Sequence, residues 1–122
     1  MENKSLGIGN FLWDKEKNEL YIVTELPLKE DVLETLSYIE ITEENLSKYL
    51  GFKRYTWYSA DLIEVFVLDL PRFHATVRKE YTNHPNKNWY LHVDNEDFST
   101  VAGVDVQYIH EIQNILILIQ DK

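Results

Sequence analysis

Five short segments rich in β-branched and aromatic residues follow one another between residues 53 and 106, and polar turn sequences separate most of them. This order predicts an antiparallel meander, because short turns join neighbouring antiparallel strands. Apolar and polar residues alternate over residues 73–77, which indicates that one face of the sheet is exposed to solvent. The predicted strands span residues 54–59, 63–68, 73–79, 89–93 and 100–104.

The segment before this meander predicts a β-hairpin and a short third element. Residues 8–13 and 20–26 are rich in strand-forming residues, and the polar turn 14–18 separates them. The apolar residues of the run 28–37 have a spacing that suits a short amphipathic helix. A third strand after the hairpin remains the alternative for this run.

Two further helices are predicted from their end signals and apolar spacing. Thr42 is a suitable N-cap for a helix over residues 43–50, and Gly51 suits the left-handed position after its end. The last helix is expected over residues 106–120, with Asp105 as its N-cap, because apolar residues recur there at intervals of three and four.

The run 115–119 within this last segment is apolar on all sides, so it suits a buried helix end or a strand and requires cover in either case. The 122 residues correspond to one domain. The predicted fold is therefore α+β: a single compact domain with a small curved antiparallel β-sheet and two or three short helices.

Composition excludes several classes of function. The chain has no cysteine, which removes disulfides, thiolate nucleophiles and cysteine-ligated zinc. Its 21 acidic and 12 basic side chains give a net charge of −9, so we expect no direct binding to nucleic acid, which requires excess Lys and Arg. No targeting segment or membrane-spanning run is recognisable, so a soluble cytoplasmic protein without a membrane partner is expected.

The acidic residues are concentrated in two stretches. Residues 25–44 contain seven acids and one lysine, and residues 94–105 contain four acids and no base. A surface of one sign accelerates association with an oppositely charged partner, although acidic faces can also serve solubility alone. The predicted partner-binding residues are Glu30, Asp31, Glu34, Glu40, Glu43, Glu44, Asp94, Glu96 and Asp97.

Enzyme motifs are lacking, so we expect no catalytic residues, no cofactor and no metal. Gly7-Ile8-Gly9 has no third glycine and no following helix, which argues against a nucleotide loop. His92 and Asp94 are expected on one sheet face with His74 across from them, and could bind a metal, but a solvated polar face is the preferred interpretation.

Other polar residues receive a similar interpretation. His84 is expected in a turn, and His110 on the solvated side of the last helix. Three carboxylates near strand ends could converge for acid–base catalysis, but nothing in the sequence indicates burial. These are Asp61, Glu64 and Asp69.

Clustered aromatic residues are compatible with a protein interface or with a nucleotide-binding pocket. Exposed Tyr and Trp side chains are typical anchors of protein interfaces, whereas core packing is their commoner role in a small sheet. The aromatic residues concerned are Tyr55, Trp57, Tyr58, Trp89 and Tyr90. A nucleotide-binding pocket would require Arg72, Arg78 and Lys79 to meet Trp57 or Trp89.

Three segments resemble a family of small proteins from phages and prophages of Bacteroidetes. Residues 8–12 (IGNFL) are similar to the family's "IGN" opening, and residues 41–52 are similar to its "PLTEEWL…LGF" helix. Residues 108–115 (YIHEIQNI) resemble its "YVHQLQNL" segment. The chain departs from the family pattern at Glu40, where a proline is usual, and at the end of the last helix.

The resemblance implies a biological setting, that of a phage protein, but no catalytic reaction. The family has no assigned catalytic residues, and the motif residues His110, Gln113 and Asn114 are expected to seat the last helix. A small acidic protein of a mobile element suits an anti-CRISPR role, with a host CRISPR effector of the Cas13b type as the partner. The alternative is a phage accessory or structural module that binds another phage protein or itself.

Overall fold

A computed structural model describes residues 5–55, 63–80 and 89–120 of the chain. The described residues form two compact units, which we name the terminal unit (within Met1–Glu40 and Tyr108–Lys122) and the middle unit (within Ile41–Gln107). Each unit has one antiparallel sheet and at least one helix, so the predicted α+β class is confirmed, with the strands divided between two sheets. The count of one domain stays a prediction.

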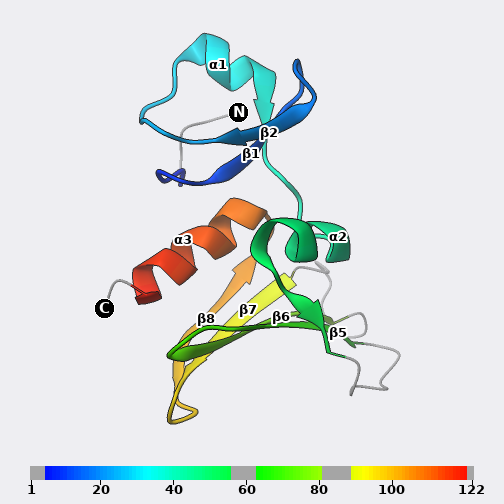
Figure 1. The fold of residues 1–122 in the computed structure, drawn as a ribbon, viewed down its shortest axis with the longest axis vertical. Coiled ribbons are helices and arrows are strands. Elements are labelled where there is room, and N and C mark those ends of the chain that lie inside the picture. Colours follow the sequence, from blue (N-terminus) through cyan, green and yellow to red (C-terminus); the bar gives the residue numbers. More distant parts are fainter. Residues whose placement is uncertain (1–4, 56–62, 81–88, 121–122) are drawn as a thin grey trace. The chain divides into compact units, whose positions relative to one another are not determined.

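The terminal unit is built on the predicted hairpin (Figure 1). Strands β1 (Phe11–Asp14) and β2 (Glu19–Ile22) pair antiparallel, and the short β3 (Leu36–Ser37) pairs with the other edge of β1. The buried carboxylate of Asp14 accepts hydrogen bonds from two backbone N–H groups of the turn, each 3.0 Å long. This contact fixes the polar turn that the sequence predicts.

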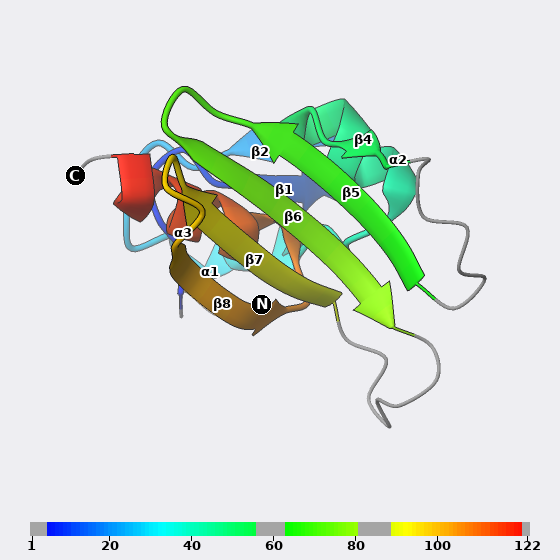
Figure 2. The ribbon, with the colours of Figure 1, turned by 90° about the horizontal axis from the view of Figure 1, so that it is seen from below.

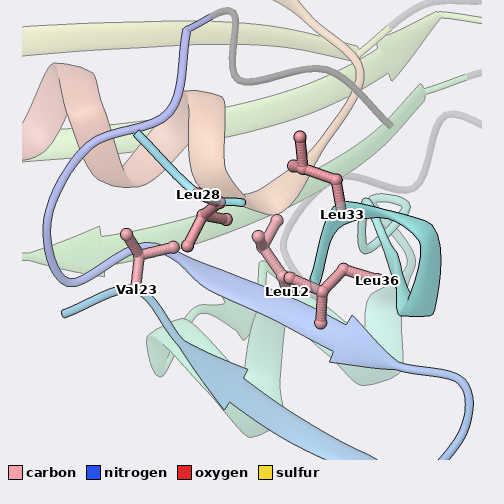
Figure 3. Close-up of a cluster of buried hydrophobic side chains, with 5 residues drawn as sticks. All are labelled: Leu12, Val23, Leu28, Leu33 and Leu36. Carbon is pink, nitrogen blue, oxygen red and sulfur yellow. The ribbon is translucent and has the colours of Figure 1, made fainter. Parts of the chain in front are cut away.

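Both alternatives for the run 28–37 are present in the structure. Helix α1 (Glu30–Thr35) forms first, and the chain then extends into β3. Figure 3 shows the apolar side chains that converge between α1, β3 and the hairpin, and these side chains form the buried cluster of this unit. The cluster consists of Leu12, Val23, Leu28, Leu33 and Leu36.

Helix α3 (Ile109–Gln120) begins later than predicted, and the prediction that Asp105 caps it is wrong. Asp105 lies in a strand that continues to Val106. The carboxylate of Glu111 instead reaches back and accepts a 2.8 Å hydrogen bond from the backbone N–H of Tyr108, as the glutamate of a capping box does. The apolar run 115–119 is helical, but Ile117 and Leu118 are 43% and 66% exposed rather than covered.

The middle unit contains the predicted meander. Its strands are β4 (Lys53–Arg54), β5 (Ile63–Asp69), β6 (Phe73–Glu80), β7 (Trp89–Asn95) and β8 (Thr100–Val106), which lie side by side in chain order. Figure 2 shows β5 to β8 next to one another in the sheet. The predicted strand 54–59 is described only as far as residue 55, and its remainder lies outside the described residues.

Side chains of β6 and β7, and those around Phe66 in β5, alternate between a buried and an open face of the sheet. The buried face includes Phe66 of β5, Val77 of β6 and Leu91 of β7, each at most 1% exposed. Trp89 also lies on this face, with its ring centroid 5.7 Å from that of Phe66. The neighbours of these buried residues along each strand are half-buried or exposed, as the alternation in the sequence predicts.

The predicted helix over residues 43–50 is confirmed as α2 (Glu43–Asn45), which continues directly into one π-helical segment, η1 (Leu46–Leu50). The Thr42 hydroxyl accepts a 3.1 Å hydrogen bond from the backbone N–H of Asn45, so the predicted cap is present. Gly51 ends the helix with φ of 80°, the left-handed conformation that the sequence predicts there.

Candidate functional site

Three of the predicted partner-binding acids lie on one short helix. Glu30, Asp31 and Glu34 belong to α1 and are all exposed, while Leu33 of the same helix is buried. No ion pair involves these three acids within the described part of the chain, and the last turn of α1 has no basic residue. The helix therefore presents three negative charges on the surface of the terminal unit.

The other acids of the first stretch are in different environments. Glu43 and Glu44 are exposed in the first turn of α2, where negative charge favours the helix dipole. The Glu43 carboxylate lies 3.3 Å from the guanidinium of Arg54, which partly neutralises it. Glu40 is exposed and pairs through its backbone with Tyr108. The two units divide after Glu40, so the predicted partner-binding acids of this first stretch belong to both units.

The second stretch is also divided by its contacts. Glu96 and Asp97 are exposed in the turn between β7 and β8. Asp94, by contrast, has a side chain only 22% exposed, and its carboxylate lies 2.7 Å from Nε2 of His92. The Thr100 hydroxyl lies 3.4 Å from this carboxylate. Asp94 thus belongs to a polar contact on the open face of the sheet, whereas Glu96 and Asp97 face solvent.

The predicted arrangement of histidines on one sheet face is confirmed. His74 of β6 lies directly opposite Asp94 of β7, and both side chains belong to the open face of the sheet. Nδ1 of His74 lies 2.6 Å from the carboxylate of Asp69 on β5. Across the described residues, no three His, Cys, Asp or Glu side chains are grouped in a way that could hold a metal ion.

Among the described residues, the candidate nucleotide residues Arg78 and Lys79 are divided between the two faces of the sheet. Asp69 is exposed and bonded to His74. Arg78 stacks over Tyr90, with 5.1 Å between its guanidinium carbon and the ring centroid, whereas Lys79 lies over Trp89 at 5.3 Å. Arg78 and Lys79 are consecutive in a strand, so these pairs lie on opposite faces.

Several residues named in these alternatives fall outside the described part of the chain. They are Trp57, Tyr58, Asp61 and His84. The side chain of Glu64 is likewise not described. Tyr55, which is described, is 43% exposed, and Trp89 is buried.

The prediction that His110 is solvated is wrong. Its side chain is 1% exposed, and its ring stacks on Tyr38, with centroids 4.9 Å apart. Tyr108 stacks at 6.0 Å. Among the described residues, neither ring nitrogen of His110 has a hydrogen-bond partner. Burial lowers the pKa of His110 below the usual 6.5, and the neighbouring charge of Glu111 opposes this only in part.

The two family-like motifs at the ends of the chain meet in the terminal unit through amide side chains. Asn10, which is fully buried, donates a 2.7 Å hydrogen bond to Asn114 on α3, and its own carbonyl oxygen accepts from the backbone N–H of Gly7. Gln113 accepts a 2.7 Å bond from the N–H of Phe11 and donates to Gly9. These contacts hold α3 against the first strand, which is the structural role expected for this motif.

Sequence reasoning missed the exposure of several apolar side chains, including one in a turn and two on α3. Phe98, in the turn between β7 and β8, is 87% exposed, and Leu118 and Ile117 are exposed on α3. An apolar residue flanked by Asp97 and Ser99 in a turn was the available sign for Phe98. The exposure on α3 has no comparable sign, because an apolar run in a sequence is typical of a core.

Comparison of the chain with protein-family models, with curated proteins and with solved structures found no match. None of the helices in residues 5–55, 63–80 and 89–120 has the length and apolar character needed to span a membrane.

Proposed function

We propose that this protein is a non-catalytic inhibitor that binds a basic protein surface through its exposed acids. The proposed target is a host RNA-guided nuclease of the Cas13b type, in the host cytoplasm. The identity of the target rests on the resemblance to small phage proteins. The mode of binding rests on charge.

The observation that supports this mode best is the acidic surface of α1. Glu30, Asp31 and Glu34 project from one helix, and no described basic side chain pairs with them. Unbalanced charge of one sign steers an oppositely charged partner and raises the association rate. A charge that is already paired, such as that of Glu43, contributes less to this field.

An RNA-guided nuclease offers a complementary surface. Such effectors hold the guide and its target in positively charged channels that recognise the nucleic-acid backbone. A small protein with a net charge of −9 can occupy part of such a channel in place of phosphates. Inhibition of this kind needs no bond to be made or broken.

The test is capture of the purified nuclease, with and without guide RNA, at low and high salt. The double variant E30Q/E34Q is compared with E16Q/E19Q, which removes two exposed charges from the β1–β2 hairpin of the same unit. We expect E30Q/E34Q to weaken capture about fivefold at low salt, for roughly 0.5 kcal/mol per exposed charge. E16Q/E19Q should have a smaller effect.

Capture that disappears at high salt supports the proposal, because the Debye length falls to about 3 Å at 1 M salt and exposed charges are then screened. Equal weakening by the two double variants would show that net charge, rather than α1, is responsible. No capture of either nuclease form at any salt would exclude the Cas13b target.

The second candidate is an accessory phage module that binds another phage protein or itself. Ile117 and Leu118 of α3 favour it, because exposed apolar neighbours on a helix are typical of protein interfaces. Sedimentation of the unmodified protein over a range of concentrations distinguishes the two functions. A concentration-dependent oligomer that L118N abolishes, together with no nuclease binding, would favour the accessory module.

A further inference from the structure

The turn between β7 and β8 presents a phenylalanine to solvent in an unusual backbone conformation. Phe98 is 87% exposed, the largest exposure among the large apolar side chains of the described residues. Its φ is 62°, in the left-handed region that glycine and asparagine favour. A bulky side chain at such a position is rare, and so its presence requires a reason.

The turn is held in one shape by its own hydrogen bonds. The Asn95 side chain accepts bonds of 2.9 and 3.0 Å from the N–H groups of Asp97 and Ser99. The backbone of Asn95 donates to Ser99 at 2.9 Å and accepts from Phe98 at 3.1 Å. Phe98 therefore projects from an ordered turn, and little backbone entropy would be lost when its ring is bound.

The requirements of the turn do not explain the identity of residue 98. Asparagine or glycine would adopt the same φ with less strain, since a left-handed conformation costs other residues about 1–2 kcal/mol. Exposure of the ring to water is also unfavourable relative to its burial. A contact outside the chain would offset both costs, because aromatic side chains are common anchors at protein interfaces.

The surroundings of Phe98 restrict the kind of partner. Glu96 and Asp97 are exposed immediately before it, and Val101, which is 45% exposed, follows in β8. An apolar centre bordered by carboxylates is complementary to an apolar pocket bordered by Lys and Arg. Phosphates of nucleic acid and anionic lipid would be repelled by these acids, and a second copy would bring a further net charge of −9.

We infer that Phe98 is the anchor by which this protein inserts into an apolar pocket, bordered by basic side chains, on its protein partner. This inference rests on the proposed function and adds a contact of the middle unit to the acids of α1. The charges of Glu96 and Asp97 raise the association rate of the partner. Burial of the Phe98 ring in the partner's pocket lowers the dissociation rate.

The test measures association and dissociation rates of F98N with the guide-loaded Cas13b-type nuclease, beside I8N as the matched control. Both variants replace an exposed apolar turn residue by asparagine, but Ile8, which is 57% exposed, lies in the terminal unit. We expect F98N to bind about 30-fold more weakly, chiefly by faster dissociation, as loss of an interface hot spot does. I8N should bind like the unmodified protein.

Thermal unfolding separates an anchor from a structural residue. Asparagine suits the left-handed conformation, so F98N should unfold at the same temperature as the unmodified protein or higher. A lower unfolding temperature for F98N would show that Phe98 stabilises the turn, and would overturn the inference.

The remaining outcomes are decisive as well. Unchanged binding by F98N, with weakened binding by E30Q/E34Q, would overturn this inference and leave the proposed function in place. Failure of the unmodified protein to bind the nuclease at any salt concentration would exclude both the proposed function and the inference about Phe98. Self-association or binding to neutral lipid vesicles that F98N abolishes would identify a different occupant, and would overturn the inference too.

Discussion

The side chains of Asn10 and Asn114 are joined by a 2.7 Å hydrogen bond, although 104 residues separate them in the chain. Asn10 is fully buried, so the bond satisfies an amide that water does not reach. Asn114 also donates a 2.8 Å bond to the carbonyl oxygen of Ser5. This pair therefore connects helix α3 to the start of the hairpin at two points.

Replacement of Asn114 by alanine should destabilise the terminal unit. The Asn10 amide would then be buried without its partner, which costs roughly 1–3 kcal/mol. Urea unfolding should show this loss for N114A, whereas Q120A, which changes an exposed residue of the same helix, should leave the free energy of unfolding nearly unchanged. Equal stability of the two variants would contradict the structural role of the pair.

The stability of the protein should fall as the pH falls below 6.5, the usual pKa of histidine. Burial lowers the pKa of His110 in the folded state, so the unfolded chain binds more protons than the folded chain between the two values. Stability that is complete above 6.5 is therefore lost toward acid, until the pH reaches the folded-state pKa.

The variant H110F tests this assignment, because phenylalanine keeps a ring against Tyr38 and Tyr108 without a titrating group. Unfolding in urea at several pH values below 6.5 should show a shallower loss of stability for H110F than for the unmodified protein. H74F removes an exposed imidazole and should keep the steeper loss. Identical pH profiles for H110F and the unmodified protein would contradict the role of His110.

Gly51 should be sensitive to substitution for conformational reasons alone. Its φ is 80°, and a Cβ atom added there would meet only Leu68, at an ordinary distance of 3.9 Å. G51A should therefore lower stability by about 1 kcal/mol, through the left-handed conformation rather than a clash. G51N should lose less, since asparagine tolerates this region, and equal losses in thermal unfolding would contradict this explanation.

The ion pair between Glu43 and Arg54 leads to a prediction of tighter partner binding, whereas the acidic variants above weaken it. R54Q removes the guanidinium 3.3 Å from the Glu43 carboxylate, so a basic partner should bind this variant more tightly, by about twofold for an exposed pair. K53Q removes the same charge from the neighbouring residue and should have a smaller effect on the dissociation constant. Weaker binding by R54Q would show that Arg54 itself contacts the partner.

Local sequence patterns predicted the elements whose stability is local. The alternating residues of β6 and β7 define strands wherever a sheet forms, and Thr42 and Gly51 fix the ends of a helix through their own backbone geometry. The start of α3 was misplaced because Asp105 is a favoured N-cap residue by type. Continuation of β8 through Asp105 to Val106, a non-local effect, places the start of the helix at Ile109 instead.

The candidate site was less predictable because its properties depend on partners distant in sequence. A charge count cannot show that Glu43 faces Arg54, or that Asp94 turns toward His92 while Asp97 faces solvent. The burial of His110 depends in the same way on Tyr38, far away in the chain. The acidic stretches are recognisable in the sequence, but only the tertiary contacts distinguish acids that have a partner from acids that face solvent.

The division of the chain has a consequence for its biosynthesis. The middle unit is one continuous segment, whereas the terminal unit joins a segment from each end of the chain. During translation the middle unit is complete before α3 has been made, so it can fold while the hairpin at residues 11–22 still lacks its helix. Asn10 then lacks its Asn114 partner until that residue leaves the ribosome, so the terminal unit is completed after the middle unit.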